Sequence, residues 1–387
     1  MIRARAYPLQ ILLLSMLAAF TSPPPEASGQ QRPAIAGRDD WSTDFSRHTV
    51  PLEEFTSGGP PKDGIGSIDR PSFMTVREAD KWIEDREPIA VVRVNGVTKA
   101  YPLSILIWHE IVNDVIGGEP VTVTYCPLCN TTIAFDRNFD GQVLDFGTTG
   151  RLRYSDLVMY DRQSETWWQQ ATGEGLVGRY AGRRLTLIPA TVMNWRSVKE
   201  QLQDALVLSR DTGFPANFRR RYGRNPYQWY DGGDGPWKRF FRYWRKDDRL
   251  PAMERVVALE SDGEYLAVPF SVLKDERVAH VKVGSLDVVV FWASGTASAV
   301  DNSTIARGRD VGSSTSFSPR IDGRVLTFEP RGNGRFRDRE TGSEWNLSGR
   351  AVKGELEGTQ LTEIVHGNHF WFAWGVFRPD TEIWRGK

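Results

Sequence analysis

The sequence predicts an α+β fold that is mostly β, arranged as two divergent tandem β-rich lobes from an internal duplication. Three observations lead to this prediction. Short apolar runs that suit strands are separated by turn residues such as Asn95-Gly96. One stretch, 104–115, has apolar residues at helical spacing. Several sequence blocks of the first half of the chain recur in the same order in the second half.

A helix and a strand are predicted directly before the two cysteines of the chain. Residues 104–115 predict the helix, and Gly117-Gly118 would end it. Residues 121–125 alternate apolar and polar side chains, which predicts a strand that runs into Cys126.

Paired sequence blocks are the evidence for the duplication. They keep their order while the distance between partners drifts, as insertions and deletions in loops would produce. The blocks are Pro102–Leu106 with Pro269–Leu273, Val121–Tyr125 with Val288–Trp292, Asp140–Leu144 with Asp322–Leu326, Asp161-Arg162 with Asp338-Arg339, and Trp168 and Trp195 with Trp345 and Trp371. They predict two similar lobes packed about an approximate twofold axis.

The chain is predicted to have five parts. Arg3 and Arg5, a short apolar run and small residues after it are typical of a secretory signal, so the protein is expected to be periplasmic or secreted. An uncleaved membrane anchor is the alternative, and no membrane span is expected after signal removal. The parts are a signal peptide (1–28), an extended lead-in (29–87), a first lobe with the Cys turn (88–213), an aromatic and basic insertion (214–249) and a second lobe (250–387).

Composition excludes one class of partner. The 387-residue chain has 49 basic and 49 acidic residues, so it has no net charge to attract nucleic acid. Hydrophobic residues make up 40% and charged residues 25%, which is ordinary for a globular protein. A small molecule or a metal ion is therefore the expected partner. The sequence does not indicate an oligomeric state.

The Cys126-Pro-Leu-Cys129 turn is the strongest candidate for chemistry. It lies between two strand-like segments, whereas the thioredoxin-type motif opens a helix. Pro127 suits a tight turn, and Asn130 tolerates the left-handed backbone conformation that often closes one. Such a turn would present both sulfurs on the same side. This arrangement predicts a site for zinc or copper, bound through thiolates.

Two thiols need further ligands, and histidines are the candidates. His109, on the predicted helix before the Cys strand, is the expected third ligand, and His369 in the second lobe is a weaker fourth. Their counterparts in the opposite lobe are other residue types, which would fit one composite site between the lobes. If the metal kept an open position, Glu110 or Asp161 could act as a catalytic base. The sequence does not decide whether the protein is an enzyme.

Two other functions are open from the sequence. The same cysteines could form a thiol–disulfide redox pair without a metal, and metal content set against free-thiol count would distinguish the two. Alternatively, the aromatic and basic residues of 214–249 could bind a glycan or another surface without catalysis, through stacking and Arg contacts.

Six sequence blocks together resemble the family called domain of unknown function 3179, which is found mainly in exported bacterial proteins. The resemblance covers most of the chain after residue 88, but Asn130 departs from the small residue that the family usually shows there. It supports grouping His109 with the Cys pair and implies no particular reaction. The blocks are His109–Asp114, Tyr125–Cys129, Phe146–Gly150, Asp156–Arg162, Tyr222–Tyr227 and Phe370–Trp374.

Overall fold

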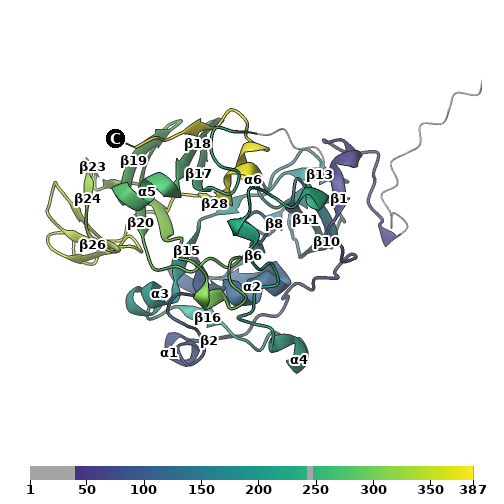
Figure 1. Cartoon of the computed structure of the whole chain (residues 1–387), viewed down its shortest axis with the longest axis horizontal. Helices are drawn as coiled ribbons and strands as arrows, with labels where there is room; N and C mark the ends of the chain where they lie inside the picture. Colours follow the sequence, from purple (N-terminus) through teal and green to yellow (C-terminus); the bar gives the residue numbers. More distant parts are fainter. Residues whose placement is uncertain (1–39, 242–246, 387) are drawn as a thin grey trace, which may run out of the picture.

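The computed structural model describes residues 40–241 and 247–386 (Figure 1). The predicted signal peptide, 1–28, and the first part of the predicted lead-in lie outside the described residues. The fold is α+β and mostly β, as the sequence predicts: many short strands form several sheets, and the helices are short. Within the described part of the chain, no helix has both the length and the apolar character needed to cross a membrane.

The first half builds a sheet from strands that are far apart in the sequence. β3 and β4 form the predicted hairpin, in which Asn95 and Gly96 both take positive φ. β15 pairs antiparallel with β3, and β16 pairs parallel with β4. The bounds are β3 (Pro88–Val94), β4 (Val97–Pro102), β15 (Ala190–Asn194) and β16 (Leu206–Leu208).

A short helix leads from this sheet to a second one. α2 (Leu103–His109) is followed by β5 (Ile111–Ile116), β6 (Glu119–Cys126) and β7 (Thr131–Asp136), which form an antiparallel sheet in the order β7-β6-β5. The prediction of a helix over 104–115 is therefore wrong beyond His109. Glu110 takes φ +59°, which ends the helix, and the β-branched residues after it continue as a strand.

The second half repeats this order of elements. Its first sheet pairs β28 antiparallel with β17 and β29 parallel with β18, and α5 leads to the antiparallel strands β19, β20 and β21. The bounds are β17 (Arg255–Ser261), β18 (Glu264–Pro269), α5 (Phe270–Glu276), β19 (Val278–Val283), β20 (Leu286–Ala293), β21 (Ser313–Phe317), β28 (Gly367–Phe370) and β29 (Glu382–Ile383). Descent of both halves from one duplicated ancestor stays a prediction.

Two of the contacts between the halves are made by strands and bear on the position of the Cys turn. β15 of the first half pairs with β21 of the second at Val192↔Ser314, which makes one sheet of eight strands. β28 of the second half lies against β7 of the first, and the Phe370 amide donates to the Cys129 carbonyl oxygen over 2.9 Å. The second contact places a strand of the second half directly against the Cys turn.

Two smaller sheets lie at opposite ends of the molecule (Figure 1). One contains β1 and β10 to β13, and the other contains β24 to β27. The bounds of the remaining elements are β1 (Phe55–Ser57), β2 (Phe73–Thr75), α1 (Val76–Ala79), β8 (Asn138–Phe139), β9 (Gln142–Val143), β10 (Phe146–Arg153), β11 (Asp156–Asp161), β12 (Trp167–Gln169), β13 (Gly175–Val177), β14 (Leu187–Ile188), α3 (Trp195–Gln201), β22 (Arg320–Ile321), β23 (Arg324–Val325), β24 (Phe328–Gly332), β25 (Arg335–Asp338), β26 (Glu344–Asn346), β27 (Ala351–Lys353) and α6 (Trp371–Gly375).

The segment 214–249 packs most of its described aromatic side chains inward. Its described residues, 214–241 and 247–249, include α4 (Ala216–Arg219) and two short 3-10 helices. Tyr222 and Tyr230 are buried, whereas the Trp229 side chain is 63% exposed. This packing accounts for the aromatic richness of the segment without a surface ligand.

A buried aspartate and a tryptophan anchor the same turn in each small sheet. In the first, Asp161 accepts hydrogen bonds from Trp168 Nε1 (2.9 Å) and from the Ser164 amide (2.6 Å). In the second, Asp338 accepts from Trp345 Nε1 (2.9 Å) and from the Thr341 amide (2.6 Å). Because Asp161 and Asp338 are fully buried, their loss would leave buried donors without acceptors.

We therefore expect Asp161→Ala and Asp338→Ala each to lower the free energy of unfolding by about 2–4 kcal/mol, measured by urea denaturation. Asp275→Ala, on the exposed face of α5, is the control and should change it by less than about 0.5 kcal/mol. Wild-type stability in either anchor variant would contradict the role given to the aspartates.

Candidate metal centre

The two cysteines lie at the turn between β6 and β7, as the sequence predicts. Cys126 is the last residue of β6 and pairs with Thr131, the first residue of β7. The Cys129 amide donates to the Cys126 carbonyl oxygen (3.3 Å), and Asn130 takes φ +54°, which closes the turn. Both cysteines are free thiols and at most 1% exposed.

Asp156, the first residue of β11, completes a group of three candidate ligands. Within the described residues, Cys126, Cys129 and Asp156 form a group whose ligand atoms all lie within 4.8 Å of one another. The carboxylate is oriented by two hydrogen bonds to Oδ2, from Gln169 Nε2 (2.6 Å) and from the Ala171 amide (2.9 Å). Such outer contacts typically fix the orientation of a metal-ligating carboxylate.

The other oxygen of Asp156, Oδ1, does not take part in these two hydrogen bonds. Oδ1 is buried and has no hydrogen bond of normal geometry from the described residues. Both thiols nevertheless lie close enough to lower the pKa of the carboxyl group, against a larger opposing effect of burial. Two sulfurs and one carboxylate oxygen thus converge in a region without water access.

Burial sets the protonation of these three groups. It raises the pKa of Asp156 to about 6 and raises the pKa of both thiols, that of Cys129 well above its usual value. The physical cause is the loss of hydration, which disfavours the charged form of each group. At neutral pH the metal-free site therefore holds two neutral thiols beside a carboxylate.

Glu110 is a fourth acidic group close to the site. Burial and the nearby Asp156 raise the pKa of Glu110 to about 8, so the carboxyl group is mostly protonated at neutral pH. Its backbone is fixed by positive φ and by the hydrogen bond that its carbonyl oxygen accepts from the Tyr125 amide (2.8 Å). The sequence predicts a catalytic base at Glu110, and the structure places this residue at the wall of a cavity of about 140 Å³.

The segment 214–249 and β28 enclose the Cys turn. Tyr230 donates from its hydroxyl group to the Leu128 carbonyl oxygen (2.9 Å), and the Phe370 amide bonds Cys129 from the other side. The cavity beside Glu110 is walled mainly by apolar and aromatic side chains, and it reaches the turn at Leu128. The segment 214–249 contributes Tyr227, Trp237, Arg239 and Phe240 to this wall.

His109, the predicted third ligand, is not part of this group. Its Nδ1 lies 2.7 Å from the Gly66 carbonyl oxygen, and its Nε2 lies 2.6 Å from the Tyr222 hydroxyl group. Because a carbonyl oxygen only accepts, Nδ1 carries the proton and Nε2 accepts from Tyr222. Burial lowers the pKa of His109 to about 4, so the ring is neutral. The structure gives both ring nitrogens protein partners and leaves neither for a metal.

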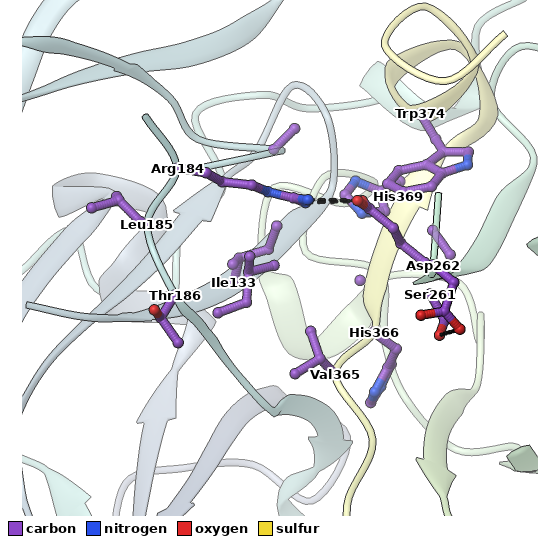
Figure 2. A pocket seen from close by; sticks show the side chains of 15 residues that line it. Ile133, Arg184, Leu185, Thr186, Ser261, Asp262, Val365, His366, His369 and Trp374 are labelled. Atoms are coloured by element: carbon purple, nitrogen blue, oxygen red, sulfur yellow. Dashed lines mark hydrogen bonds and ion pairs between the residues drawn. The ribbon is translucent and has the colours of Figure 1, made fainter. Parts of the chain in front are cut away.

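His369 and Asp161 also lie outside the group. His369, on β28, has Nδ1 2.8 Å from Thr131 Oγ1, and its ring packs on Trp374 at 5.1 Å between centroids. It lines a different cavity, shown in Figure 2. Asp161 is held by the turn and tryptophan contacts described above, so both of its oxygens already accept hydrogen bonds.

One family model matches this chain. It is described as "Protein of unknown function (DUF3179)", and it matches residues 62–381. The chain belongs to this family. The match confirms the resemblance stated from the sequence, and it includes the Cys turn, Asp156 and Glu110. No curated protein and no solved structure matches the chain. The DUF3179 description carries no activity, so the function is argued from the site.

The sequence predicts the turn correctly, but Asp156, the third candidate ligand of the group, was not predicted. In the sequence, Asp156 stands out only as the first residue of the block Asp156–Arg162, one of the six that carry the family resemblance. A usable signal is that this aspartate directly precedes the apolar strand-like run 157–160, because a charged residue buried with such a strand seldom lacks a partner.

The raised pKa of Glu110 has a consequence for stability. Its carboxyl group has a higher pKa in the folded protein, about 8, than in the unfolded chain, where it is about 4.3. The folded state therefore binds more protons between these values, and its free energy of unfolding falls as pH rises from about 5 to 8.

We expect Glu110 to contribute to the metal-free protein a loss of stability over this range with a slope of up to about 1.4 kcal/mol per pH unit. Glu110→Gln should flatten the profile, measured by urea denaturation at several pH values in the presence of a chelator. Buried His109, His366 and His369 have lowered pKa values and contribute the opposite slope at the acidic end of this range, so the difference between the two profiles is the test. A profile that Glu110→Gln leaves unchanged would contradict the assigned protonation.

Proposed function

We propose that this protein binds a zinc ion through the sulfurs of Cys126 and Cys129 and Oδ1 of Asp156. The observation that carries the proposal is the convergence of three ligand atoms within 4.8 Å of one another, with the carboxylate oriented by Gln169 and Ala171. Three protein ligands leave one tetrahedral position, the arrangement typical of catalytic zinc sites.

The donor set favours zinc over copper. Thiolates suit both zinc and Cu(I), but a carboxylate oxygen is a hard ligand that zinc accepts and Cu(I) does not favour. With a histidine as the third ligand, as the sequence predicts, the donor set would suit zinc and copper equally well. With Asp156 as the third ligand, the donor set suits zinc better than copper.

Burial of the site supports a metal rather than a redox disulfide. An attacking thiol in an oxidoreductase is exposed and has a lowered pKa, because the thiolate is the nucleophile. Cys126 and Cys129 are buried and have raised pKa values. A cation in the site would favour both thiolates and offset the cost of burying their charge.

The cavity beside Glu110 supports a reaction at the open position. Bound zinc supplies Lewis-acid chemistry at such a position. Glu110 holds a proton at neutral pH and lines a cavity that reaches the Cys turn at Leu128, so it could donate this proton to a molecule bound there and later take it back. On the basis of the basic and apolar residues in 1–28, we also propose that the protein is exported.

Metal content tests the proposal directly. We expect purified wild-type protein dialysed against zinc to retain about one zinc ion per chain by elemental analysis. Cys126→Ser and Asp156→Asn should lose most of it, because each removes a ligand. His109→Ala is the matched control and should keep the ion, because His109 bonds Gly66 and Tyr222 instead.

Far-ultraviolet circular dichroism should accompany these measurements, so that loss of metal is not confused with loss of fold. Stoichiometric zinc in folded Cys126→Ser would overturn the proposed site. Loss of zinc in folded His109→Ala would instead support His109 as a zinc ligand, as the sequence predicts.

Proton release is an independent measure of thiolate coordination. Because burial raises the pKa of both thiols, they are protonated at pH 7.5 in the metal-free protein and must lose their protons to bind zinc. Zinc titration by calorimetry in buffers of different ionisation enthalpy should report about two protons released per ion. Affinity should therefore fall as the pH falls. Binding without proton release would exclude the two thiols as ligands.

A further inference from the structure

The cavity beside Glu110 is small and is built from separate parts of the chain. Its volume is about 140 Å³, below the roughly 300–1,000 Å³ of pockets that hold drug-sized ligands, so only a short molecule fits. The lead-in supplies Gly58, Pro60 and Ile65 to its lining. Strands β10 and β11 supply a second part of the lining, and the segment 214–249 supplies a third.

Close backbone contacts hold the lead-in against β10. The Gly58 amide donates to the Gly150 carbonyl oxygen (2.9 Å), and the Asp63 amide donates to the Thr148 carbonyl oxygen (2.9 Å). Gly150 has φ +70°, and a Cβ atom there would lie 2.1 Å from the Pro60 carbonyl oxygen, so this position requires glycine. This part of the cavity wall is therefore formed before any ligand binds, which lowers the cost of ordering it on binding.

Two arginines give the cavity a positive charge. Arg151, on β10, is half-buried, and burial lowers the pKa of its guanidinium group, which nevertheless stays charged at neutral pH. Arg239 is exposed, and its guanidinium carbon lies 4.6 Å from the ring centroids of both Trp237 and Phe240. Glu110 is the one carboxylic acid among the described lining residues, so even its ionised form would leave the lining positive.

Most other side chains of the lining are apolar. Such walls favour the burial of a hydrocarbon body, whereas a phosphate or sulfate ion would leave oxygens against them without partners. A planar carboxylate matches the fork of N–H donors on a guanidinium group. The cavity therefore suits a molecule with one carboxylate and a short apolar body. The apolar lining residues are Ile65, Leu128, Leu152, Leu157, Trp237 and Phe240.

We propose that this cavity binds a short-chain monocarboxylate, whose carboxylate accepts hydrogen bonds from Arg151 and Arg239 and whose hydrocarbon chain packs on the apolar walls. As an assignment of substrate class it rests on the proposed function, because the same cavity reaches the Cys turn at Leu128. Binding itself uses none of the three proposed zinc ligands, so the two proposals can be tested apart.

Butyrate and butyramide are matched probes, since they have the same shape and only butyrate carries a charge. We expect saturable butyrate binding in ligand-observed NMR titrations at pH 7.5, with butyramide at least about tenfold weaker because it lacks a charge-assisted hydrogen bond. Acetate should also bind about tenfold more weakly than butyrate, because it buries two fewer methylene groups. Inorganic phosphate at an equal concentration should not displace butyrate.

Four variants locate the binding. Arg151→Gln should weaken butyrate binding at least about tenfold, and Arg239→Gln at least about threefold, with butyramide changed by less than about twofold in both. Ile65→Trp should weaken both probes by filling the cavity. Arg77→Gln, at an exposed arginine of α1 outside the cavity, is the matched control and should change neither affinity. Circular dichroism shows whether each variant is folded.

Zinc content separates this inference from the proposed function. Because a carboxylate can also coordinate zinc, the butyrate titration is repeated on chelator-treated wild-type protein, with zinc measured in each sample. Binding within about threefold of that to the zinc-loaded protein would support the arginine site, even if the elemental analysis refuted the zinc site. Butyrate binding that requires zinc would overturn the inference and leave the zinc site standing.

The comparison of probes on the wild type does not depend on the folding of any variant. Equal affinities of butyrate and butyramide, or no saturable binding of butyrate, would overturn the inference. Displacement of butyrate by an equal concentration of phosphate would overturn it as well, because it would indicate a site for any small anion.

Discussion

Enclosure of the Cys126–Cys129 turn is the constraint on which the rest of the site depends. The turn is held at Leu128 by Tyr230 and at Cys129 by the Phe370 amide, and these contacts come from distant parts of the chain. With water excluded, every acidic group at the turn becomes harder to ionise. Burial is the largest cause of the raised pKa values of the two thiols, of Asp156 and of Glu110, and the nearby Asp156 adds to the shift of Glu110. In the same enclosure, a bound cation would stabilise the thiolate and carboxylate charges that the apolar surroundings disfavour.

Local chemistry made the turn predictable from the sequence. Alternating strands on both sides, Pro127 within the turn and Asn130 after it each specify backbone conformation over a few residues, and the structure has that conformation. The start of α2 could be predicted in the same way. Its end could not, because the reversal at Glu110 depends on a strained φ of +59° that packing maintains, although helical spacing continued beyond it.

The ligands beyond the turn depend on tertiary contacts that the sequence does not display. His109 seemed suited to the metal because it precedes the Cys strand by few residues, but its ring points to Gly66 and Tyr222, a residue 113 positions away. Asp156 lies 30 positions after Cys126 in the sequence. It comes close to Cys126 only in the folded protein, where it begins β11, the strand that pairs with β10. A composite site with ligands from both halves was also expected. Instead, all three proposed ligands belong to the first half, and the second half contributes the enclosing strand β28.

The central claim is that two sulfurs and one carboxylate oxygen share a zinc ion. X-ray absorption spectroscopy at the zinc edge of the loaded protein tests it most directly. The account predicts two sulfur scatterers at about 2.3 Å together with oxygen scatterers at about 2.0–2.2 Å. Asp156→Asn, if it retains any zinc, should keep the sulfur shell and change the oxygen shell. A spectrum of nitrogen and oxygen scatterers without sulfur would contradict the account.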